Sequence, residues 1–321
     1  MEGLVSIITP CFNNATMVAE TIRSVVEQSY PYWELICVDD GSTDNTCNII
    51  SEFCKQCHNI KLIKREREPK GGSVCRNIGI EHAKGEYIVF LDADDILHVD
   101  CLKNRVESII DTDLDFVVFP NATIKKGVIG KVTSDFRIKK HFLAFSSNHA
   151  AWQTTCPLYR ISFVKSIGGF DETFPRLQDV EFGIRCLAES SGNYASFLQR
   201  SGADCFYRIS ENKQSFTKKY DLAFSTLPKL YALVERLFKE EKYNKNDFSK
   251  VLLCMILSSI MISQSTSHKQ SYKDIFPQNI FKYLLISDSF WLKVLDLTKN
   301  CGAYYCKLAH LLRYIILRLY Y

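Results

Sequence analysis

An apolar run at residues 87–91 that ends abruptly in Asp92, Asp94 and Asp95 constrains the fold of this chain more than any other feature. Such a continuous run is typical of a strand buried on both faces of a parallel sheet. Open α/β sheets bind ligands just beyond the carboxyl ends of their strands. Carboxylates clustered there repel one another unless a cation holds them, and hard divalent cations prefer oxygen ligands. The segment predicts a site for diphosphate-bound Mg²⁺ or Mn²⁺; the alternative is a solvated acidic turn that caps the next helix.

Two earlier strands end in the same way. Residues 35–38 form an apolar run that is followed by Asp39, Asp40 and a Gly-Ser-Thr sequence leading into a helix. Residues 4–9 form another, which a polar turn closes. Polar strand ends that meet at one edge of a sheet predict a single shared crevice.

Strands and helices alternate over the first part of the chain. Strands are expected near residues 4–9, 35–38, 60–64, 87–91 and 116–119, and helices near residues 18–28, 44–57, 72–82 and 100–111. This alternation predicts an α/β fold with a mostly parallel sheet flanked by helices. A Lys-Lys-Gly sequence at 125–127 predicts a hairpin turn.

Composition is consistent with an intracellular enzyme. With 321 residues, of which 46% are hydrophobic, the chain can form one large domain and an appendage. Its start lacks a basic segment before the first apolar run, so no signal peptide is expected. The 13 cysteines are interpreted as reduced thiols of a cytoplasmic protein. A Cys-x-x-Cys-His sequence at 54–58 fits haem attachment, but we interpret it as coincidence because such attachment needs export.

The motifs at the strand ends resemble the signature series of family 2 glycosyltransferases. The matching segments are, in order, residues 6–13, 38–44, 76–79, 85–95 and 168–171. The resemblance implies a GT-A type sheet in a nucleotide-sugar-binding and catalytic domain over residues 1–212. Residues 213–321 would then form a helical C-terminal region.

The resemblance also implies which residues bind the donor and its metal. The nucleotide-binding residues would be Thr9, Pro10, Asn13, Asp40, Arg76 and Asp92. The ligands of the cofactor, Mn²⁺ or Mg²⁺, would be Asp92, Asp94 and Asp95. Asp40 would accept a hydrogen bond from the N3–H of uracil, and Arg76 would approach the diphosphate, unless it is part of a surface ion pair. Many relatives place a His after a late Tyr-Arg pair to complete the metal shell. This chain continues with Ile and Ser, so the third protein ligand stays open.

Inverting glycosyl transfer needs a carboxylate that takes the proton of the acceptor hydroxyl. In the family this base is the Asp of a Glu-Asp pair that opens a helix, and here the pair reads Gln178-Asp179. The resemblance therefore implies Asp179 as the catalytic base, with Glu181 as the next candidate. The acceptor-binding residues would be Trp152, Asp171 and Gln178. A buried core position is the alternative for the tryptophan, and closure of a turn is the alternative for Asp171.

The last third of the chain differs in charge. Residues 211–321 contain 17 Lys and Arg against 9 Asp and Glu, and no apolar run there reaches the ~20 residues needed to span a bilayer. Leucines and isoleucines at helical spacing over 304–321 share one face of a predicted helix, and basic residues lie on the opposite face. This pattern predicts an interfacial helix on anionic lipid, and the alternative is a helix packed on the catalytic domain.

The resemblance, taken with these features, implies an inverting glycosyltransferase that uses a UDP-linked sugar. The acceptor would be a saccharide or lipid-linked saccharide, as in bacterial surface polysaccharide assembly, and no nucleic acid partner is expected. The protein would be cytoplasmic or peripheral at the inner face of the membrane. One alternative is a sugar-1-phosphate nucleotidyltransferase, although the turn after the first strand lacks the Gly-rich loop that such enzymes carry. A non-catalytic nucleotide-binding protein is the other.

Overall fold

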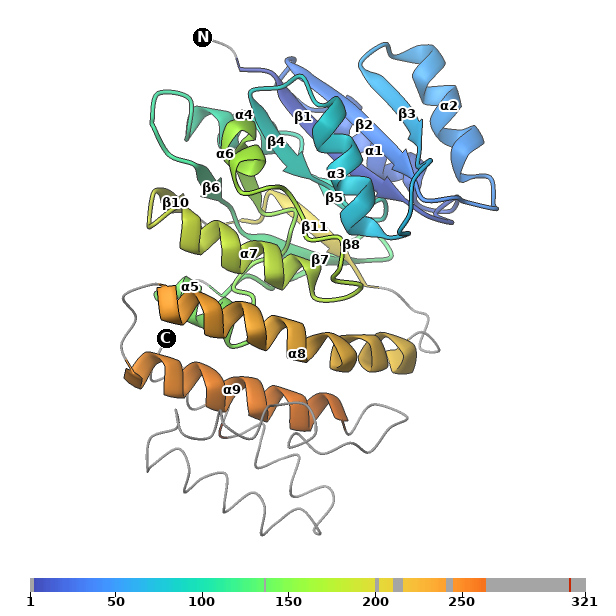
Figure 1. Cartoon of the computed structure of the whole chain (residues 1–321). Coiled ribbons are helices and arrows are strands. Elements are labelled where there is room, and N and C mark those ends of the chain that lie inside the picture. The colour runs from blue at the N-terminus through green and yellow to red at the C-terminus, as the bar shows by residue number, and fades with distance from the viewer. Residues whose placement is uncertain are drawn as a thin grey trace. The chain divides into compact units, whose positions relative to one another are not determined.

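The computed structural model describes residues 3–135, 137–199, 202–209, 216–240 and 245–263, together with Leu312. The chain forms two compact units (Figure 1). The first comprises Met1–Phe136, Trp152–Thr173 and Glu189–Ser210, and the second comprises Arg137–Ala151, Phe174–Ala188 and Glu211–Tyr321. The interfacial helix predicted over 304–321 lies outside the described residues, apart from Leu312.

A seven-stranded sheet forms the centre of the first unit. Its strands, in spatial order, are β10 (Tyr194–Ser196), β6 (Phe116–Val118), β9 (Pro157–Arg160), β4 (Tyr87–Phe90), β1 (Val5–Cys11), β2 (Trp33–Asp39) and β3 (Ile60–Lys64). β4, β1, β2 and β3 are parallel neighbours, and β9 runs antiparallel between β4 and β6. The predicted α/β fold with a mostly parallel sheet is therefore confirmed.

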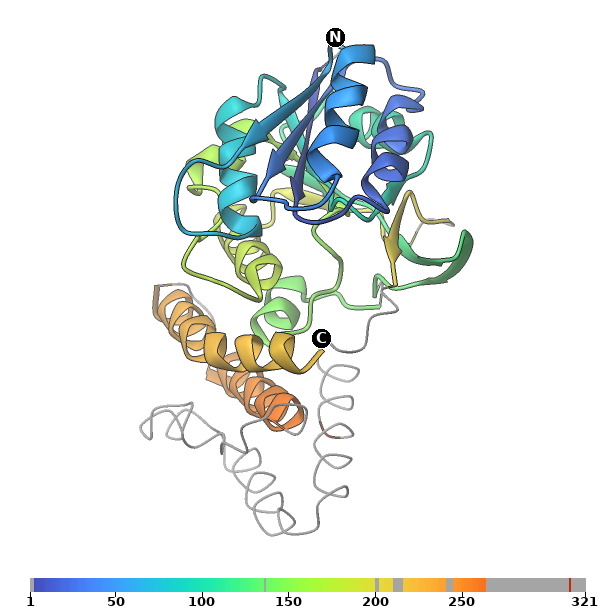
Figure 2. The same cartoon turned by 90° about the vertical axis from the view of Figure 1, so that its right-hand side faces the viewer.

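Helices cover both faces of this sheet. They are α1 (Val18–Val26), α2 (Thr46–Gln56), α3 (Gly72–His82), α4 (Cys101–Glu107) and α6 (Ile161–Ser166). Figures 1 and 2 show α3 on one face, and α1 and α2 on the other. The contact of α3 with β1 is close because residue 79 is a glycine: a Cβ there would lie 2.4 Å from Cγ2 of Ile8. Ile36 and Val38 of β2 pack on the same helix through Val74 and Ile78.

A second, four-stranded sheet completes the first unit. Its order is β5 (Ile96–Leu97), β11 (Cys205–Arg208), β7 (Asn121–Lys125) and β8 (Val128–Val132). The expected hairpin turn joins β7 to β8. β5 follows the acidic segment 92–95 directly and pairs with β11. This pairing brings residues of β11 next to carboxylates that precede them by more than a hundred positions.

The second unit is helical. Its elements are α5 (His141–Ser146), α7 (Gln178–Glu189), α8 (Phe216–Glu240) and α9 (Lys245–Ser263). α9 packs against α8 and α5, and the ring of Phe238 stacks on Phe248 with 4.9 Å between the centroids. Over the described residues of 213–321, the structure has the two long helices α8 and α9. Among the described helices, none combines the length and the apolarity that crossing a membrane requires.

Candidate active site

The two acids at the carboxyl end of β2 have different partners. Asp39 is buried, and its carboxylate accepts the backbone N–H groups of Gly41 at 3.1 Å and of Ser42 at 3.1 Å. These bonds close a turn in which Gly41 takes a positive φ of 89°, a conformation that side chains disfavour. Asp39 therefore stabilises the turn that follows β2.

Asp40 instead faces residues from another loop. Its Oδ1 accepts Nε–H of Arg65 at 2.6 Å and the backbone N–H of Gly71 at 3.2 Å. The two donors fix the plane of the carboxylate. Burial, reinforced by the charge of Asp40, raises the pKa of the neighbouring Cys75 thiol to about 12. The thiol thus stays protonated at neutral pH beside the carboxylate.

The turn after β1 is tied to the turn after β2. The side-chain oxygen of Asn13 accepts the N–H of Thr43 at 2.8 Å, and the N–H of Asn13 donates to Oγ of Ser42 at 3.0 Å. The structure thus gives Asn13, an expected nucleotide-binding residue, a role in joining two loops. Side chains alternate along a strand, so Pro10 shares the face of Ile8 beside α3. Thr9 points to the opposite face and is buried.

The three acids after β4 also divide. Asp95 is only 2% exposed, and its Oδ1 accepts the backbone N–H of Arg208 at 3.0 Å. Burial, reinforced by the nearby charge of Asp92, raises the pKa of the Asp95 carboxyl well above its usual range. Nε of Arg208 donates to the carbonyl of Asp94 at 2.8 Å, and its Nη2 pairs with Glu20 at 2.6 Å. Arg208 and Asp95 therefore hold the acidic loop in place.

Asp92 and Asp94 are the acids of this loop that a cation can reach, because both are partly exposed. Their oxygens suit Mg²⁺ or Mn²⁺. In the part of the chain that the structure describes, no three His, Cys, Asp or Glu side chains converge on a metal centre. The expected trio of ligands is thus not assembled as one cluster, since Asp95 is buried against Arg208. A cation held by Asp92 and Asp94 would take its other oxygen ligands from the bound sugar donor or from water.

Arg76 of α3 contacts this loop from the side. Its Nη2 donates to Oδ1 of Asp92 at 2.6 Å, and its guanidinium lies over the ring of Phe170 at 5.2 Å. Arg76 is 5% exposed, and its Nε and Nη1 are buried without a hydrogen-bond partner among the described residues. A buried donor left unpaired costs about 1–3 kcal/mol. An anionic ligand would remove this cost.

Ser73 is a candidate that sequence reasoning missed. Its hydroxyl is buried without a partner in the described structure, and it lies in the first turn of α3, one turn before Arg76. Helix N-termini attract anions because their first N–H groups have no helical partner. The Gly-Gly-Ser sequence at 71–73 followed by Arg76 was the available signal.

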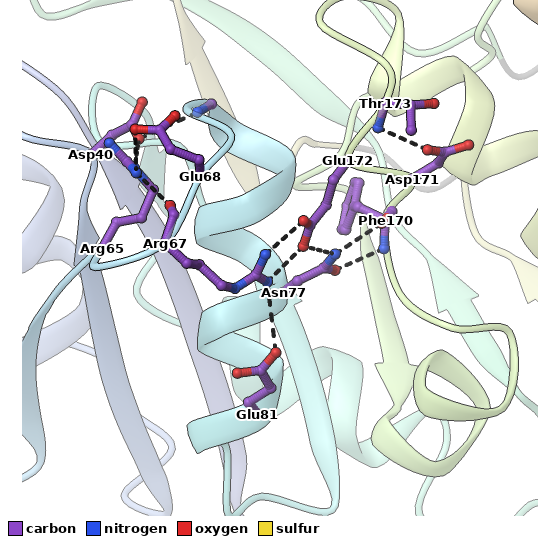
Figure 3. A network of polar contacts seen from close by, with 11 residues as sticks. Asp40, Arg65, Arg67, Glu68, Asn77, Glu81, Phe170, Asp171, Glu172 and Thr173 are labelled. Carbon is purple, nitrogen blue, oxygen red and sulfur yellow. Dashed lines mark hydrogen bonds and ion pairs between the residues drawn. The ribbon is translucent and has the colours of Figure 1, made fainter.

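The turn at residues 168–173 is held by α3 and by the loop between β3 and α3 (Figure 3). The carboxamide of Asn77 exchanges two hydrogen bonds with the backbone of Phe170, at 2.9 and 2.8 Å. Arg67 binds both carboxylate oxygens of Glu172 at 2.6 Å. This pairing lowers the pKa of the Glu172 carboxyl. Sequence reasoning assigned no role to Arg67 or Asn77.

The residues expected at the acceptor lie in different surroundings. Asp171 accepts the N–H of Thr173 at 2.8 Å and so closes its own turn. Trp152 is buried in the first unit, with its ring centroid 6.4 Å from that of Tyr194. Gln178 begins α7 in the second unit.

The two candidate bases on α7 differ in accessibility. Asp179 is exposed, whereas Glu181 is buried and forms an ion pair with Arg185. Leu177, just before the helix, has a positive φ of 61°. Of these two carboxylates, Asp179 is therefore the one that is open to solvent.

Comparisons with known proteins show which family the chain belongs to. Residues 6–167, half of the chain, match the family model described as glycosyl transferase family 2. The putative teichuronic acid biosynthesis glycosyltransferase TuaG of Bacillus subtilis is 40% identical over 115 residues, which are 36% of this chain and 45% of that protein. The Escherichia coli UDP-Glc:alpha-D-GlcNAc-diphosphoundecaprenol beta-1,3-glucosyltransferase WfgD is 34% identical over 139 residues, 43% of this chain and 53% of that protein. The chain thus spans about half the length of these curated relatives.

Solved structures share the fold. Staphylococcus aureus TarS 1-349 in complex with UDP-GlcNAc superposes with a TM-score of 0.64 at 16% identity, covering 98% of this chain and 90% of that one. The mannosyltransferase PcManGT from Pyrobaculum calidifontis, in complex with GDP-Man and Mn²⁺, gives a TM-score of 0.57 at 18% identity, covering 100% and 88%. At this identity the likeness concerns the fold alone.

Proposed function

The chain belongs to the family 2 glycosyltransferases, and we propose that it transfers a sugar, with inversion, from a UDP-linked donor to a saccharide or lipid-linked saccharide. The observation that carries this proposal is the state of Arg76, a buried guanidinium with one nitrogen on Asp92 and two without partners. The diphosphate of a nucleotide sugar supplies the acceptor oxygens that these nitrogens lack.

The donor would lie across the ends of β1, β2 and β4. Asp40 would accept N3–H of the uracil ring, with Arg65 and Gly71 holding its carboxylate in orientation. Thr9 and Pro10 would line the base through their backbone, and Arg76 and the Ser73 hydroxyl would bind the phosphates. The UDP-GlcNAc complex of TarS supports a uridine donor, since the two proteins share this fold.

Asp92 and Asp94 would hold a divalent cation. Mn²⁺ or Mg²⁺, when bound, neutralises the charge that develops on the departing diphosphate. Asp95 would act through the loop alone, because it is buried against the backbone of Arg208. The Mn²⁺ complex of PcManGT supports a metal requirement.

Asp179 would act as the base. Its carboxylate takes the proton of the acceptor hydroxyl, the hydroxyl oxygen attacks the anomeric carbon, and the nucleoside diphosphate leaves from the opposite side. The configuration at that carbon is therefore inverted. Trp152, Asp171 and Gln178 remain the expected acceptor-binding residues. The late processivity motif Gln-x-x-Arg-Trp is absent from the sequence, so we expect one sugar added per encounter.

One relative supports a lipid-linked acceptor and a location at a membrane surface. WfgD acts on a lipid-linked diphosphate sugar by its name, and a lipid-linked acceptor would bring this enzyme to a membrane surface. The basic, amphipathic sequence at 304–321 suits such a peripheral contact with anionic lipid.

Two parallel reactions test the proposal with the full chain and Mn²⁺. One is hydrolysis of a panel of UDP-, GDP- and dTDP-sugars, and the other is pyrophosphate release from UTP and a sugar-1-phosphate. Release of UDP from one UDP-sugar is the expected result. Pyrophosphate release instead would identify a nucleotidyltransferase, and binding without either reaction would identify a non-catalytic nucleotide-binding protein.

A further inference from the structure

The loop at residues 65–71 connects the expected nucleobase site at Asp40 to the turn at residues 168–173. Arg65 and Arg67 are two positions apart on this loop, and their side chains reach in different directions (Figure 3). Arg65 reaches Asp40, and Arg67 reaches Glu172. All these residues belong to the first unit.

At the nucleobase site, Arg65 links the side chain of Asp40 to the backbone of the 65–71 loop. Arg65 donates through Nε to Asp40 at 2.6 Å, and through Nη1 to the carbonyl of Arg67. The Arg65 side chain is nearly buried. A change in the orientation of the Asp40 carboxylate would therefore move Arg65 and, through it, shift the backbone of Arg67.

The contact at the turn has a fixed geometry. Arg67 donates through Nη1 and Nη2 to the two carboxylate oxygens of Glu172, each at 2.6 Å. Such a fork-to-fork pair fixes orientation as well as distance. Asn77 donates to the same carboxylate at 2.9 Å and accepts the N–H of Phe170 at 2.8 Å. Glu172 and Phe170 flank Asp171, an expected acceptor residue.

We propose that Arg67 is a positioning residue that couples nucleotide occupancy at Asp40 to the geometry of the 168–173 turn. The inference rests on the proposed function, because it requires a nucleotide base at Asp40. A bound base restricts Asp40 and Arg65, and with them the 65–71 loop. The ion pair of Arg67 with Glu172 then costs less ordering entropy, so the turn becomes more rigid once the donor is bound. The acceptor side of the site is thus prepared by the donor.

Two backbone amides report on the two ends of this connection. The N–H of Gly71 donates to Asp40, and the N–H of Phe170 donates to Asn77. Hydrogen exchange of both amides can be measured with and without UDP and Mn²⁺. In the wild-type protein, UDP should slow exchange at both. In Arg67→Gln, UDP should still slow Gly71, and the effect on Phe170 should be lost.

Glu81→Gln is the matched control. Glu81 also contacts Arg67, at 3.7 Å, but it is exposed and lies on α3 rather than on the turn, so this variant should behave as wild type. If Arg67→Gln does not fold, Arg67→Lys serves instead, because a lysine keeps the charge and loses the two-pronged contact.

The outcomes separate the two proposals. A response of Phe170 in Arg67→Gln equal to that of wild type would overturn the coupling, as would a wild-type protein in which UDP slows Gly71 alone. If neither UDP nor GDP, CDP or dTDP slows Gly71, the donor site itself is wrong and the coupling falls with it. Both proposals are supported if UDP slows exchange at both amides in the wild-type protein, and if in the Arg67 variant it slows exchange at Gly71 but no longer at Phe170.

Discussion

Acidic residues lie at or just beyond the carboxyl ends of both β2 and β4, and a comparison of the two loops shows that these residues have different roles. At each strand end one carboxylate is buried and accepts backbone N–H: Asp39, the last residue of β2, and Asp95, which follows β4. In each loop another carboxylate pairs with an arginine from a different element. Asp40 pairs with Arg65, and Asp92 pairs with Arg76.

The two arginine pairs differ in how far they are satisfied. The side chain of Asp40 is 15% exposed, and that of Asp92 is 42% exposed. Arg65 spreads its donors over Asp40, Glu68 and a backbone carbonyl, whereas Arg76 has two buried nitrogens without a partner in the described structure. An anionic ligand would pair the two buried nitrogens of Arg76. We therefore propose that the diphosphate lies at the β4 loop and the neutral nucleobase at the β2 loop.

The largest effect should follow from Asp94→Asn. If Asp92 and Asp94 hold the cation, the variant should lose turnover and bind nucleotide more weakly only when Mn²⁺ or Mg²⁺ is present. Turnover of UDP-sugar and calorimetric titration of UDP with and without metal would measure both effects. Asp113→Asn, at an exposed position outside both loops, is the control. Wild-type activity that persists in EDTA would contradict the metal-dependent role of the β4 loop.

Asp179→Asn should leave both loops unchanged and still stop transfer. Loss of a general base typically lowers the rate by ~10²–10⁴-fold, so kcat should fall by this factor while affinity for the donor stays the same. The donor affinity of the variant is the internal control for a correctly folded donor site. Near-normal transfer would assign the base to another carboxylate, and burial against Arg185 makes Glu181 a poor substitute.

The fold could be predicted from the sequence, and so could the grouping of polar strand ends at one edge of the sheet, because both depend on local patterns. The apolar run 87–91 ends within one residue of the end of β4, and polar residues follow at one edge of the sheet. The division of labour within each loop could not be predicted. Asp92 and Asp95 are chemically identical, and their difference arises from Arg76 and from Arg208, which is 113 positions from Asp95 in the chain.

The missed residues have the same explanation. The roles of Arg67 and Asn77 become recognisable only through their contacts with Glu172, and the tertiary fold determines where Glu172 lies. Ser73 was missed because a serine in the first turn of a helix is common, and only burial of its hydroxyl without a partner distinguishes it.

Arg76→Lys should weaken UDP binding more than Arg65→Lys does. A lysine keeps one charge but cannot serve Asp92 and a diphosphate together, since it lacks the planar fork of donors. We expect a Kd for UDP about tenfold higher, which corresponds to ~1.4 kcal/mol. Arg65→Lys should change the preference among UDP, CDP and GDP more than the affinity for UDP. Equal losses of UDP affinity in both variants would show that the two loops are not specialised in this way.

The smallest effect concerns stability, and it tests the role of Asp95. Because burial raises the pKa of this carboxyl above its unfolded value of about 3.9, the folded wild-type protein loses stability as pH rises from that value through the folded pKa. Asparagine does not titrate, and its oxygen can still accept the N–H of Arg208. Asp95→Asn should therefore gain stability relative to wild type as pH rises, with Tm differences of a few degrees in metal-free buffer. Glu172→Gln should show the opposite trend, because its carboxyl has a lowered pKa and stabilises the fold only when ionised, an effect lost as pH falls through the folded pKa. If Asp95→Asn instead loses stability as pH rises, Asp95 is ionised in the fold, and the contrast between the buried and the ligand-facing acids of the β4 loop would have to be abandoned.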